Sequence, residues 1–343
     1  MKICLITRYF DSRNAGIGRV SCKLRDGLKS QGHEVIPVST NGESLLSYFY
    51  YSAFQVPGLL PKDADVYHAI TPVEGIWLKK RSVVTYLDLI PMTHPERAGA
   101  GIGYNQLLNM IGSTYFSECA KKSSKADKII CISEYTKQDV IERLKVPESK
   151  IRVIRLGINP DLDYIPQTKT KFVFGYLGQL DRRKRVDLLI REFLKTKVDA
   201  ELWIAGTGRD EPMLKELAFG DERIKFLGFI PDEKLRWFYN SLSYFIFPTW
   251  IEGYGLPIVE SLACRTPVIV CDDAIIPNDV KKHCISVQQD LRHIINAAYQ
   301  GWSSTSYSAY LASDESYRWA KSHDWDKCIK EHIEVYKELR GRE

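Results

Sequence analysis

The sequence predicts an α/β protein built from two doubly wound parallel sheets that face each other across a cleft. Short apolar runs alternate with segments whose apolar residues have helical spacing, which is typical of parallel strands joined by helices. This alternation stops at a polar stretch with two prolines, residues 160–171, and then starts again. At 343 residues the chain is long enough for two ordinary domains. We therefore expect one domain over residues 1–165 and a second that begins at residue 166.

The composition indicates a soluble globular protein, with 44% hydrophobic and 27% charged residues. The first residues form a short strand rather than the apolar core of a signal peptide, so we expect a cytoplasmic location. An uncharged run, residues 44–60, is too short and too polar to span a bilayer. The eight cysteines form no CxxC pair and are expected to be buried, reduced thiols.

Charge is distributed unevenly along the chain. Residues 1–170 contain 23 Lys and Arg against 17 Asp and Glu, a net charge of +6, whereas the remainder has 25 against 26, a net charge of −1. No dense basic stripe is present, so we do not expect nucleic acid as a partner. A mildly basic first half suits an anionic ligand or an anionic membrane surface, with an ordinary solvated surface as the alternative.

In the first half, five short apolar runs are predicted strands and three longer segments are predicted helices. The strands are residues 3–6, 35–38, 66–68, 83–86 and 129–132, and the helices are residues 16–31, 104–122 and 134–144. Gly32 ends the first helix, because glycine adopts the left-handed backbone conformation common after a helix.

In the second half the same alternation repeats. The strands are residues 172–177, 202–205, 224–227, 244–247 and 267–271, and the helices are residues 186–195, 211–217, 232–240, 257–263, 290–299 and 325–339. Ligands of such sheets bind beyond the carboxyl ends of the strands. Both Gly16–Gly18 and the Glu252–Glu260 stretch would lie at such ends.

The stretch from Glu252 to Glu260 is the strongest candidate for a site. Gly253 and Gly255 leave backbone amides uncovered, and Pro257 is well placed as the first residue of a helix. A glycine loop that leads into a helix start attracts phosphate, because unpaired N–H groups gather there. The alternative is a helix with acidic residues in its first turns, as the helix dipole prefers; the glycines and the proline favour the anion site.

Two other stretches could hold an anion. Gly16 and Gly18 open a helix and could let the backbone approach a phosphate. A dinucleotide-binding loop would need these glycines directly after the first strand, but about nine residues intervene. Arg183 and Lys184 follow the strand 172–177 and could neutralise a departing diphosphate, with a solvated basic turn as the alternative.

Together these motifs resemble the retaining nucleotide-sugar glycosyltransferases of family 4, which have two Rossmann-like domains in the GT-B architecture. The resemblance covers nearly the whole chain and is highly specific for the family, but it says little about the sugar. The matching motifs are Glu252-x7-Glu260 with Phe247-Pro248 before it and Cys264–Ile269 after it, Gly206-Thr207-Gly208, Phe226–Ile230, Ser133-Glu134 and Arg155–Asn159.

The resemblance implies a role for each matching residue. Glu260 would bind the ribose hydroxyls of the donor, while Glu252 would hold the donor sugar. Lys184 and Arg183 would pair with the diphosphate and are the implied catalytic residues together with Glu252. The implied donor-binding set is completed by Gly206, by the backbone of Phe229 and Ile230 at the base, by the amides of Gly253, Tyr254, Gly255 and Leu256, and by Gly16, Gly18 and Asp88 of the first domain. Residues 325–343 resemble the family's closing helix, which returns to the first domain. The resemblance thus implies an acceptor-binding domain over residues 1–165 and a donor-binding domain over residues 166–324.

The chain departs from the family pattern in three places. Gln179 stands where many members have Arg, so Arg183 would carry the charge beside Lys184. Leu87 stands where many have a His that contacts the donor sugar, so Asp88 or a backbone carbonyl would substitute. Asn278 stands where a Glu is common.

The resemblance implies transfer of a hexose, with retention, from a nucleotide diphosphate sugar to a sugar or lipid-linked acceptor. A non-catalytic nucleotide-sugar-binding protein, or an epimerase or hydrolase on the same fold, is the alternative. We expect no cofactor and no metal, because Asp63-Ala64-Asp65 precedes a strand like an ordinary loop. The aromatic run 48–54 is either core or an exposed patch for a lipid acceptor, which would place the protein peripherally at the inner face of the membrane.

Overall fold

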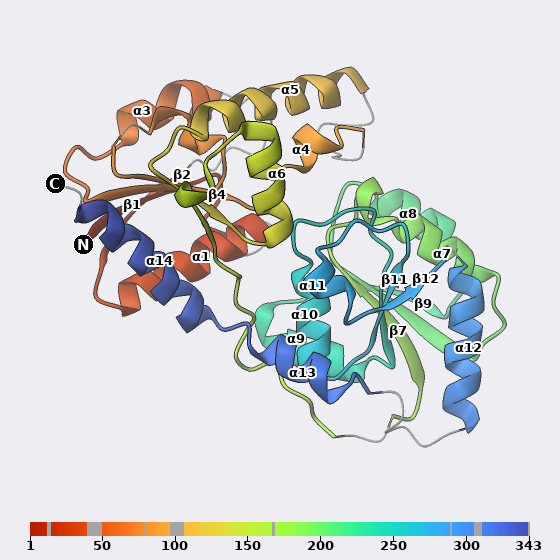
Figure 1. Ribbon diagram of the computed structural model, residues 1–343. Helices are drawn as coiled ribbons and strands as arrows, with labels where there is room; N and C mark the ends of the chain where they lie inside the picture. The colour runs from red at the N-terminus through yellow and green to blue at the C-terminus, as the bar shows by residue number, and fades with distance from the viewer. Residues whose placement is uncertain are drawn as a thin grey trace. The chain divides into compact units, whose positions relative to one another are not determined.

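The computed structural model describes residues 1–11, 15–39, 50–78, 80–96, 106–166, 169–288, 290–304 and 311–341. The chain divides into two compact units (Figure 1). Unit 1 contains Met1–Gly157 and Trp325–Glu343, and unit 2 contains Ile158–Asp324. The predicted α/β class with two Rossmann-like domains is confirmed, since each unit holds a six-stranded sheet flanked by helices.

Unit 1 is built on a parallel sheet with the strand order β2-β1-β3-β4-β5-β6. Its strands are β1 (Lys2–Thr7), β2 (Glu34–Ser39), β3 (Val66–Ala69), β4 (Ser82–Tyr86), β5 (Lys128–Cys131) and β6 (Ile151–Val153). In β1, Ile3 pairs with Val35 on one side and with Val66 on the other. The last strand was not predicted, because three residues at the edge of a sheet carry too little apolar pattern to be recognised.

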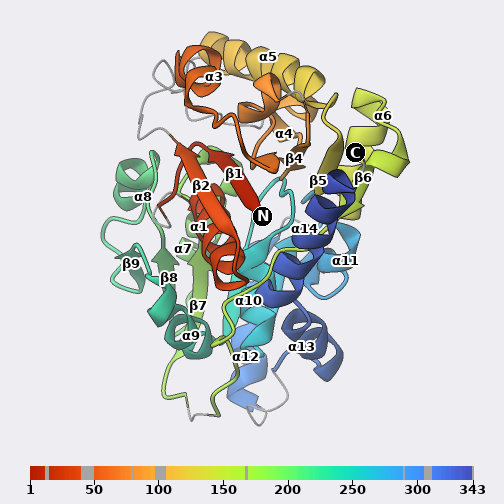
Figure 2. The same cartoon turned by 90° about the vertical axis from the view of Figure 1, so that its left-hand side faces the viewer.

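Helices cover both faces of this sheet. They are α1 (Ala15–Ser30), α3 (Val56–Leu59), α4 (Ile90–Thr93), α5 (Gln106–Ser123), α6 (Glu134–Leu144) and α14 (Trp325–Arg340), with single turns η1 (Tyr51–Gln55), η2 (Glu74–Trp77) and η3 (Glu148–Lys150). Helices α1 and α14 lie side by side in both views, and α3 and α5 lie together on the opposite side of the sheet (Figures 1 and 2). Among the described residues, no helix is long and apolar enough to cross a membrane.

The C-terminal helix packs closely on the first helix of the chain. A β-carbon added at Gly27 of α1 would lie 2.6 Å from Cγ1 of Ile329 in α14. Glycine therefore allows the two helix backbones to approach, as small residues do where helices pack tightly. This contact ties the last residues of the chain to the first domain.

Unit 2 has a parallel sheet with the strand order β12-β11-β10-β7-β8-β9. Its strands are β7 (Phe172–Leu177), β8 (Ala200–Ala205), β9 (Ile224–Gly228), β10 (Tyr244–Phe247), β11 (Val268–Cys271) and β12 (Ile285–Val287). The order reverses between the neighbours β7 and β10. Their carboxyl ends form the switch point at which doubly wound sheets bind ligands.

Helices again cover both faces of the sheet. They are α7 (Val186–Leu194), α8 (Glu211–Leu217), α9 (Asp232–Ser241), α10 (Leu256–Ala263), α11 (Asn278–Lys281), α12 (Leu291–Ser304) and α13 (Asp314–Lys321), with the single turn η4 (Arg182–Lys184) after β7. Helix α7 packs against α8 and α12, whereas α10 packs against α13 (Figure 1). Helix α10 starts at Leu256, so Pro257 is its second residue and not, as predicted, its first.

The first residues after Gly157 belong to unit 2, so the boundary lies before the predicted residue 165. The backbone N–H of Ile158 donates to the carbonyl of His323, 3.2 Å away. Asp163 is held through both its side chain and its main chain, because Tyr317 Oη donates to its carboxylate at 2.7 Å and Asn240 Nδ2 donates to its carbonyl at 2.9 Å. These bonds explain why a polar, proline-containing stretch is not a free linker.

Two buried histidines connect α14 to the sheet of unit 1. His68 of β3 is fully buried, with Nδ1 2.7 Å from Tyr336 Oη and Nε2 2.8 Å from Thr85 Oγ1. His332 of α14 places Nδ1 2.8 Å from the carbonyl of Cys328. Burial, and then the neighbouring His332, holds the pKa of His68 well below its usual range, and burial lowers the pKa of His332 to about 4. Both rings are therefore neutral in the folded protein near pH 7.

We predict that acid destabilises unit 1 through these histidines. The unfolded chain binds their protons as the pH falls below 6.5, whereas folded His332 does not bind its proton until about pH 4. The free energy of unfolding is therefore fully present above pH 6.5 and falls by about 1.4 kcal/mol per pH unit per histidine as the pH is lowered through this window. Urea unfolding midpoints measured between pH 4.5 and 7.5 test this.

The variant His332→Phe should have a shallower pH slope, because it keeps a buried ring and removes the titration. His293→Asn is the matched control, since His293 is exposed on α12 and its loss should leave the slope unchanged. Equal slopes in the wild type and His332→Phe would contradict the prediction.

Candidate functional site

The candidate site is formed by the turns that follow β7 and β10 at the switch point of unit 2. After β7, Asp181 caps the turn η4, because its Oδ1 accepts the backbone N–H of Lys184 at 3.3 Å. After β10, the backbone N–H of Trp250 donates to the carbonyl of Arg183 at 3.0 Å. The two turns are thus joined through their main chains, although they are far apart in sequence.

One carboxylate oxygen of Glu252 contacts three polar groups. Its Oε1 lies 2.6 Å from Lys184 Nζ, 2.6 Å from Thr249 Oγ1 and 3.3 Å from Arg183 Nη1. Lys184 and Glu252 are only 7% and 8% exposed. The structure thus brings together the three side chains implied as catalytic, and it adds Thr249, which the sequence analysis missed.

The environment sets the ionisation of this pair. Burial would raise the pKa of Glu252, but Lys184 and Arg183 lower it below its usual value, so the side chain is a carboxylate. Burial and the neighbouring Arg183 lower the pKa of Lys184 against the opposing effect of Glu252. Lys184 Nζ also lies 5.1 Å from the ring centroid of Phe247, within the range of a cation–π contact.

The glycine loop that leads into α10 is held firmly on both sides. The backbone N–H of Glu252 donates to the carbonyl of Ile275 at 2.9 Å. Gly255 has a φ of +98°, a conformation that favours glycine, and it precedes the first residue of α10. Tyr254 is buried and hydrogen-bonds through Oη to Nε2 of His323, which lies just before the chain returns to unit 1.

Glu260 lies one turn inside α10. It is 1% exposed, and its Oε2 accepts a hydrogen bond of 2.8 Å from Tyr239 Oη of α9. The side chains of Glu252 and Glu260 thus hydrogen-bond to different residues, Lys184 and Tyr239 respectively.

Other predicted donor-binding residues lie at the ends of β8 and β9. Gly206 has a φ of +116°, and a β-carbon there would meet the carbonyl oxygen of Gly178 at 1.9 Å. Only glycine allows this close crossing of two turns. Phe229 is 46% exposed directly after β9, whereas Ile230 is buried.

The remaining predicted residues belong to unit 1. Gly16 and Gly18 lie in the first turn of α1, where Gly16 is exposed and Gly18 is buried. Asp88 follows β4, and its Oδ1 accepts the backbone N–H of Ile90 at 3.0 Å at the start of α4. Asp88 therefore has a local structural role within this unit.

The metal-like Asp63–Asp65 stretch is bound to Lys2. Asp63 Oδ2 lies 2.5 Å from Lys2 Nζ, and Asp65 Oδ2 accepts the backbone N–H of Lys2 at 2.8 Å. Among the described residues, no group of three or more His, Cys, Asp or Glu side chains is arranged to hold a metal ion.

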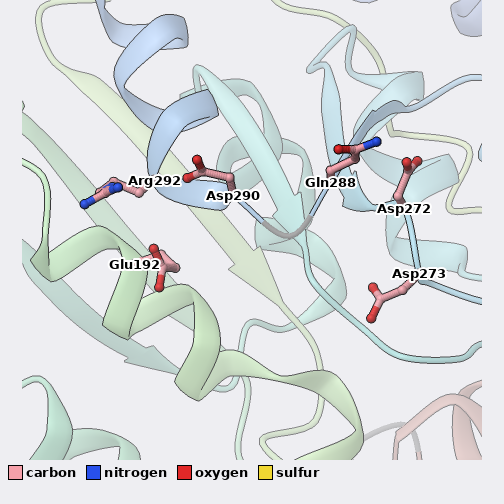
Figure 3. Close-up of a pocket in the computed structure, with 6 residues that line it drawn as sticks. All are labelled: Glu192, Asp272, Asp273, Gln288, Asp290 and Arg292. Atoms are coloured by element: carbon pink, nitrogen blue, oxygen red, sulfur yellow. The ribbon is translucent and has the colours of Figure 1, made fainter.

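A separate pocket of about 600 Å³ lies in unit 2 (Figure 3). Its lining residues are Glu192, Asp272, Asp273, Gln288, Asp290 and Arg292. Four carboxylates against one guanidinium would repel a diphosphate, so this pocket does not replace the site around Lys184. It is connected to that site through Asp273, which also binds Arg185.

Comparisons with known proteins relate the chain to glycosyltransferases. The model for "Glycosyl transferases group 1" matches residues 171–300, and the model for "Glycosyltransferase Family 4" matches residues 43–162. The chain is similar to the uncharacterized glycosyltransferase MJ1607 of Methanocaldococcus jannaschii, with 25% identity over 100% of both chains. It is also 25% identical to O-antigen chain mannosyltransferase B of Escherichia coli, over 76% of this chain and 71% of that protein.

Solved structures show the same fold. The structure of Anabaena Alr3699/HepE in complex with UDP and glucose matches 98% of this chain and 100% of its own, with a TM-score of 0.72 and 17% identity. At this level of identity the likeness concerns the fold, and it extends over both units.

We predict that Lys184→Met destabilises the protein because it leaves the carboxylate of Glu252 buried without its nearest cation. Removing one partner of a buried ion pair costs about 3 kcal/mol or more. The double variant Lys184→Met, Glu252→Gln should recover part of this loss, because no charge is then left unpaired. The measurement is a double-mutant cycle by chemical unfolding.

The exposed pair Lys337 and Glu334 of α14, 2.8 Å apart, is the matched control. Its coupling should be about 0.5 kcal/mol or less, as for other helix-surface pairs. A coupling at Lys184–Glu252 as small as this control would mean that the buried pair does not hold the loop.

Proposed function

We propose that this chain, which belongs to the family 4 glycosyltransferases and has their GT-B fold, transfers a hexose from a nucleotide diphosphate sugar to a sugar or lipid-linked acceptor with retention at the anomeric carbon. The observation that carries the proposal is the cluster of Lys184, Arg183 and Glu252 at the switch point of unit 2. Two cations and a glycine-led helix start suit a diphosphate, and a buried carboxylate suits a hydroxyl-rich ligand.

The nature of the donor is supported by two of the similar proteins. The Anabaena protein is described in complex with UDP and glucose, and the Escherichia coli relative is an O-antigen mannosyltransferase. We therefore assign a nucleoside diphosphate hexose to this site. Glu260, buried on α10 beside Tyr239, is assigned to the ribose, because a carboxylate accepts hydrogen bonds from two neighbouring hydroxyls.

The chemistry follows from the charges. As the bond between the anomeric carbon and the donor phosphate breaks, negative charge develops on the departing diphosphate. Lys184 and Arg183 stabilise it, and Glu252 keeps the ammonium in position so that little reorganisation is needed during the reaction. The acceptor oxygen forms the new bond on the same face, and its proton passes to the departing phosphate oxygen. No metal ion is needed in this scheme, since cations and backbone amides neutralise the diphosphate.

The function is tested with a thermal-shift panel of nucleotide sugars, because a bound donor stabilises the folded state by mass action. The donor that raises the melting temperature is then used for turnover with sugar and lipid-linked acceptors, with and without excess chelator. Release of nucleoside diphosphate that depends on the acceptor, with an unchanged anomeric configuration by NMR, supports the proposal. Donor binding without turnover favours a non-catalytic binding protein, and product without acceptor favours an epimerase or hydrolase. Loss of turnover on chelation, restored by Mg²⁺ or Mn²⁺, would contradict metal independence.

We predict that the two glutamates separate binding from turnover. Glu260→Gln should weaken both the donor and the free nucleoside diphosphate, by about 1.5–3 kcal/mol for a hydrogen bond to a charged group. Glu252→Gln should lower turnover more than nucleoside diphosphate affinity, because Glu252 is assigned to the sugar, while Lys184 and Arg183 keep their positive charges for the diphosphate. Titration with nucleoside diphosphate and with intact donor, beside turnover, distinguishes the two. Equal loss of nucleoside diphosphate affinity in both variants would show the assignment to be wrong.

We further propose peripheral contact with an anionic membrane through an apolar patch of unit 1. The aromatic run is divided, because Tyr51 is 1% exposed in the core while Tyr50 and Phe54 are exposed, with ring centroids 5.6 Å apart. Residues 48 and 49 lie outside the described residues. We define the apolar patch as Tyr50, Phe54, Leu59 and Trp77. Trp77 Nε1 donates to the carbonyl of Ser52 at 2.7 Å, which joins η2 to η1.

Exposed lysines, Lys62 and Lys80, lie three residues after Leu59 and Trp77 and suit an anionic surface. We predict that Phe54→Asp reduces sedimentation with vesicles containing anionic lipid by several-fold, because it places a charge in the apolar patch. The control is Phe219→Asp, since Phe219 is 91% exposed in unit 2. Equal binding by wild type and Phe54→Asp, or no binding by the wild type, would remove the membrane contact.

A further inference from the structure

Arg185, directly after Lys184, has a backbone conformation that an arginine adopts only at a cost. Its φ is +52°, in the left-handed region, where glycine is the least strained residue. Among the described residues, the other non-glycine positions with positive φ are Arg81, Lys145 and Arg265. Strain of this kind persists where the surrounding contacts compensate for it.

The side chain of Arg185 makes those contacts with the residues that follow β10 and with Asp273. It is 6% exposed and makes four hydrogen bonds. Nε donates to the carbonyl of Pro248 at 2.5 Å, and Nη2 donates to the carbonyl of Thr249 at 3.0 Å. Nη1 and Nη2 also donate to the two carboxylate oxygens of Asp273, at 2.7 and 2.8 Å.

These bonds act on the residues around Glu252. Pro248 and Thr249 lie between the end of β10 and Glu252, and the hydroxyl of Thr249 donates to Glu252 itself. Lys184, the nearest cation to Glu252, is the residue before Arg185. Arg185 therefore connects the backbone that carries Lys184 to the backbone that carries Thr249 and Glu252.

Asp273 holds the arginine from the other side. It follows β11 and lines the acidic pocket of unit 2 (Figure 3). A guanidinium can donate to a carboxylate with two parallel N–H groups and still direct further N–H groups at carbonyls, which a lysine ammonium cannot do in the same fixed geometry. The contacts thus require an arginine, although the backbone would prefer a glycine.

We propose that Arg185, oriented by Asp273, is a positioning residue that keeps the Thr249–Glu252 segment in the register needed for Glu252 to meet Lys184. The inference rests on the proposed function, because it assigns the arginine to the same diphosphate and sugar site. Small displacements of a positioned group reduce turnover strongly, by up to ~100-fold for about 1 Å.

The test compares Arg185→Lys, Arg185→Gly and Asp273→Asn with Arg182→Ala. Arg185→Gly relieves the backbone strain and removes the guanidinium. Arg185→Lys keeps the positive charge but loses the parallel N–H groups that donate to Asp273. Arg182 is exposed in the same turn, so Arg182→Ala is the control that removes one positive charge from this turn. The readouts are kcat, donor KM, nucleoside diphosphate affinity and amide hydrogen exchange of residues 249–256.

We expect kcat to fall at least ~10-fold in Arg185→Lys and Arg185→Gly and less in Asp273→Asn, because an Asn still accepts one hydrogen bond. Nucleoside diphosphate affinity should change less than kcat, and exchange of residues 249–256 should become faster. Arg182→Ala should match the wild type within about twofold. A merely structural role would lower stability without changing kcat of the folded enzyme.

The proposal is overturned if kcat and exchange are unchanged in Arg185→Lys and Asp273→Asn. If Arg185→Gly does not fold, these two milder variants decide the outcome. If the wild type turns over no donor, the proposed function fails, but the exchange measurement still tests whether Arg185 holds the segment.

Discussion

The buried ion pair between Lys184 and Glu252 is the interaction on which the arrangement of unit 2 depends. Two charges out of water are costly unless their geometry is good and further hydrogen bonds complete them. Thr249 and Arg183 supply those bonds to Glu252, and main-chain bonds from Trp250 and Glu252 hold the loop in place. A looser arrangement of the site would leave a buried charge unpaired, which favours this one.

The structure explains how the site can do without the cation that many family members have at the position of Gln179. Gln179, where many members have a cation, is exposed, and its carbonyl accepts a hydrogen bond from Tyr176 Oη at 3.0 Å. Arg183 instead reaches Glu252 and also donates to the carbonyl of Ile251 at 2.7 Å. A second cation thus stands beside Lys184 from a different position in the same turn. Asp88, by contrast, is engaged with the start of α4.

The fold was predictable to a large extent, because strands and helices that are buried on a sheet carry strong apolar patterns. The family and its two Rossmann-like domains are confirmed, and the Glu252-x7-Glu260 spacing pointed to the loop that we propose as the functional one. The misses have physical causes. The edge strands β6 (Ile151–Val153) and β12 (Ile285–Val287) are too short to show a pattern. Helix α10 starts one residue early because proline is tolerated in the first turn of a helix. The roles assigned to individual donor-binding residues stay predictions.

The sequence by itself determined which residue types lie at the carboxyl ends of the strands, since glycines, a proline and acids after apolar runs have local conformational preferences. Only the tertiary structure decided which of them meet. The strand order brings β7 beside β10 although about 70 residues separate them, and this pairing sets Lys184 against Glu252. The tertiary structure also explains why an arginine stands at position 185 in spite of its strained backbone. The partners that compensate for the strain are distant from Arg185 in the sequence and reach it only in the folded protein. They are Pro248, Thr249 and Asp273.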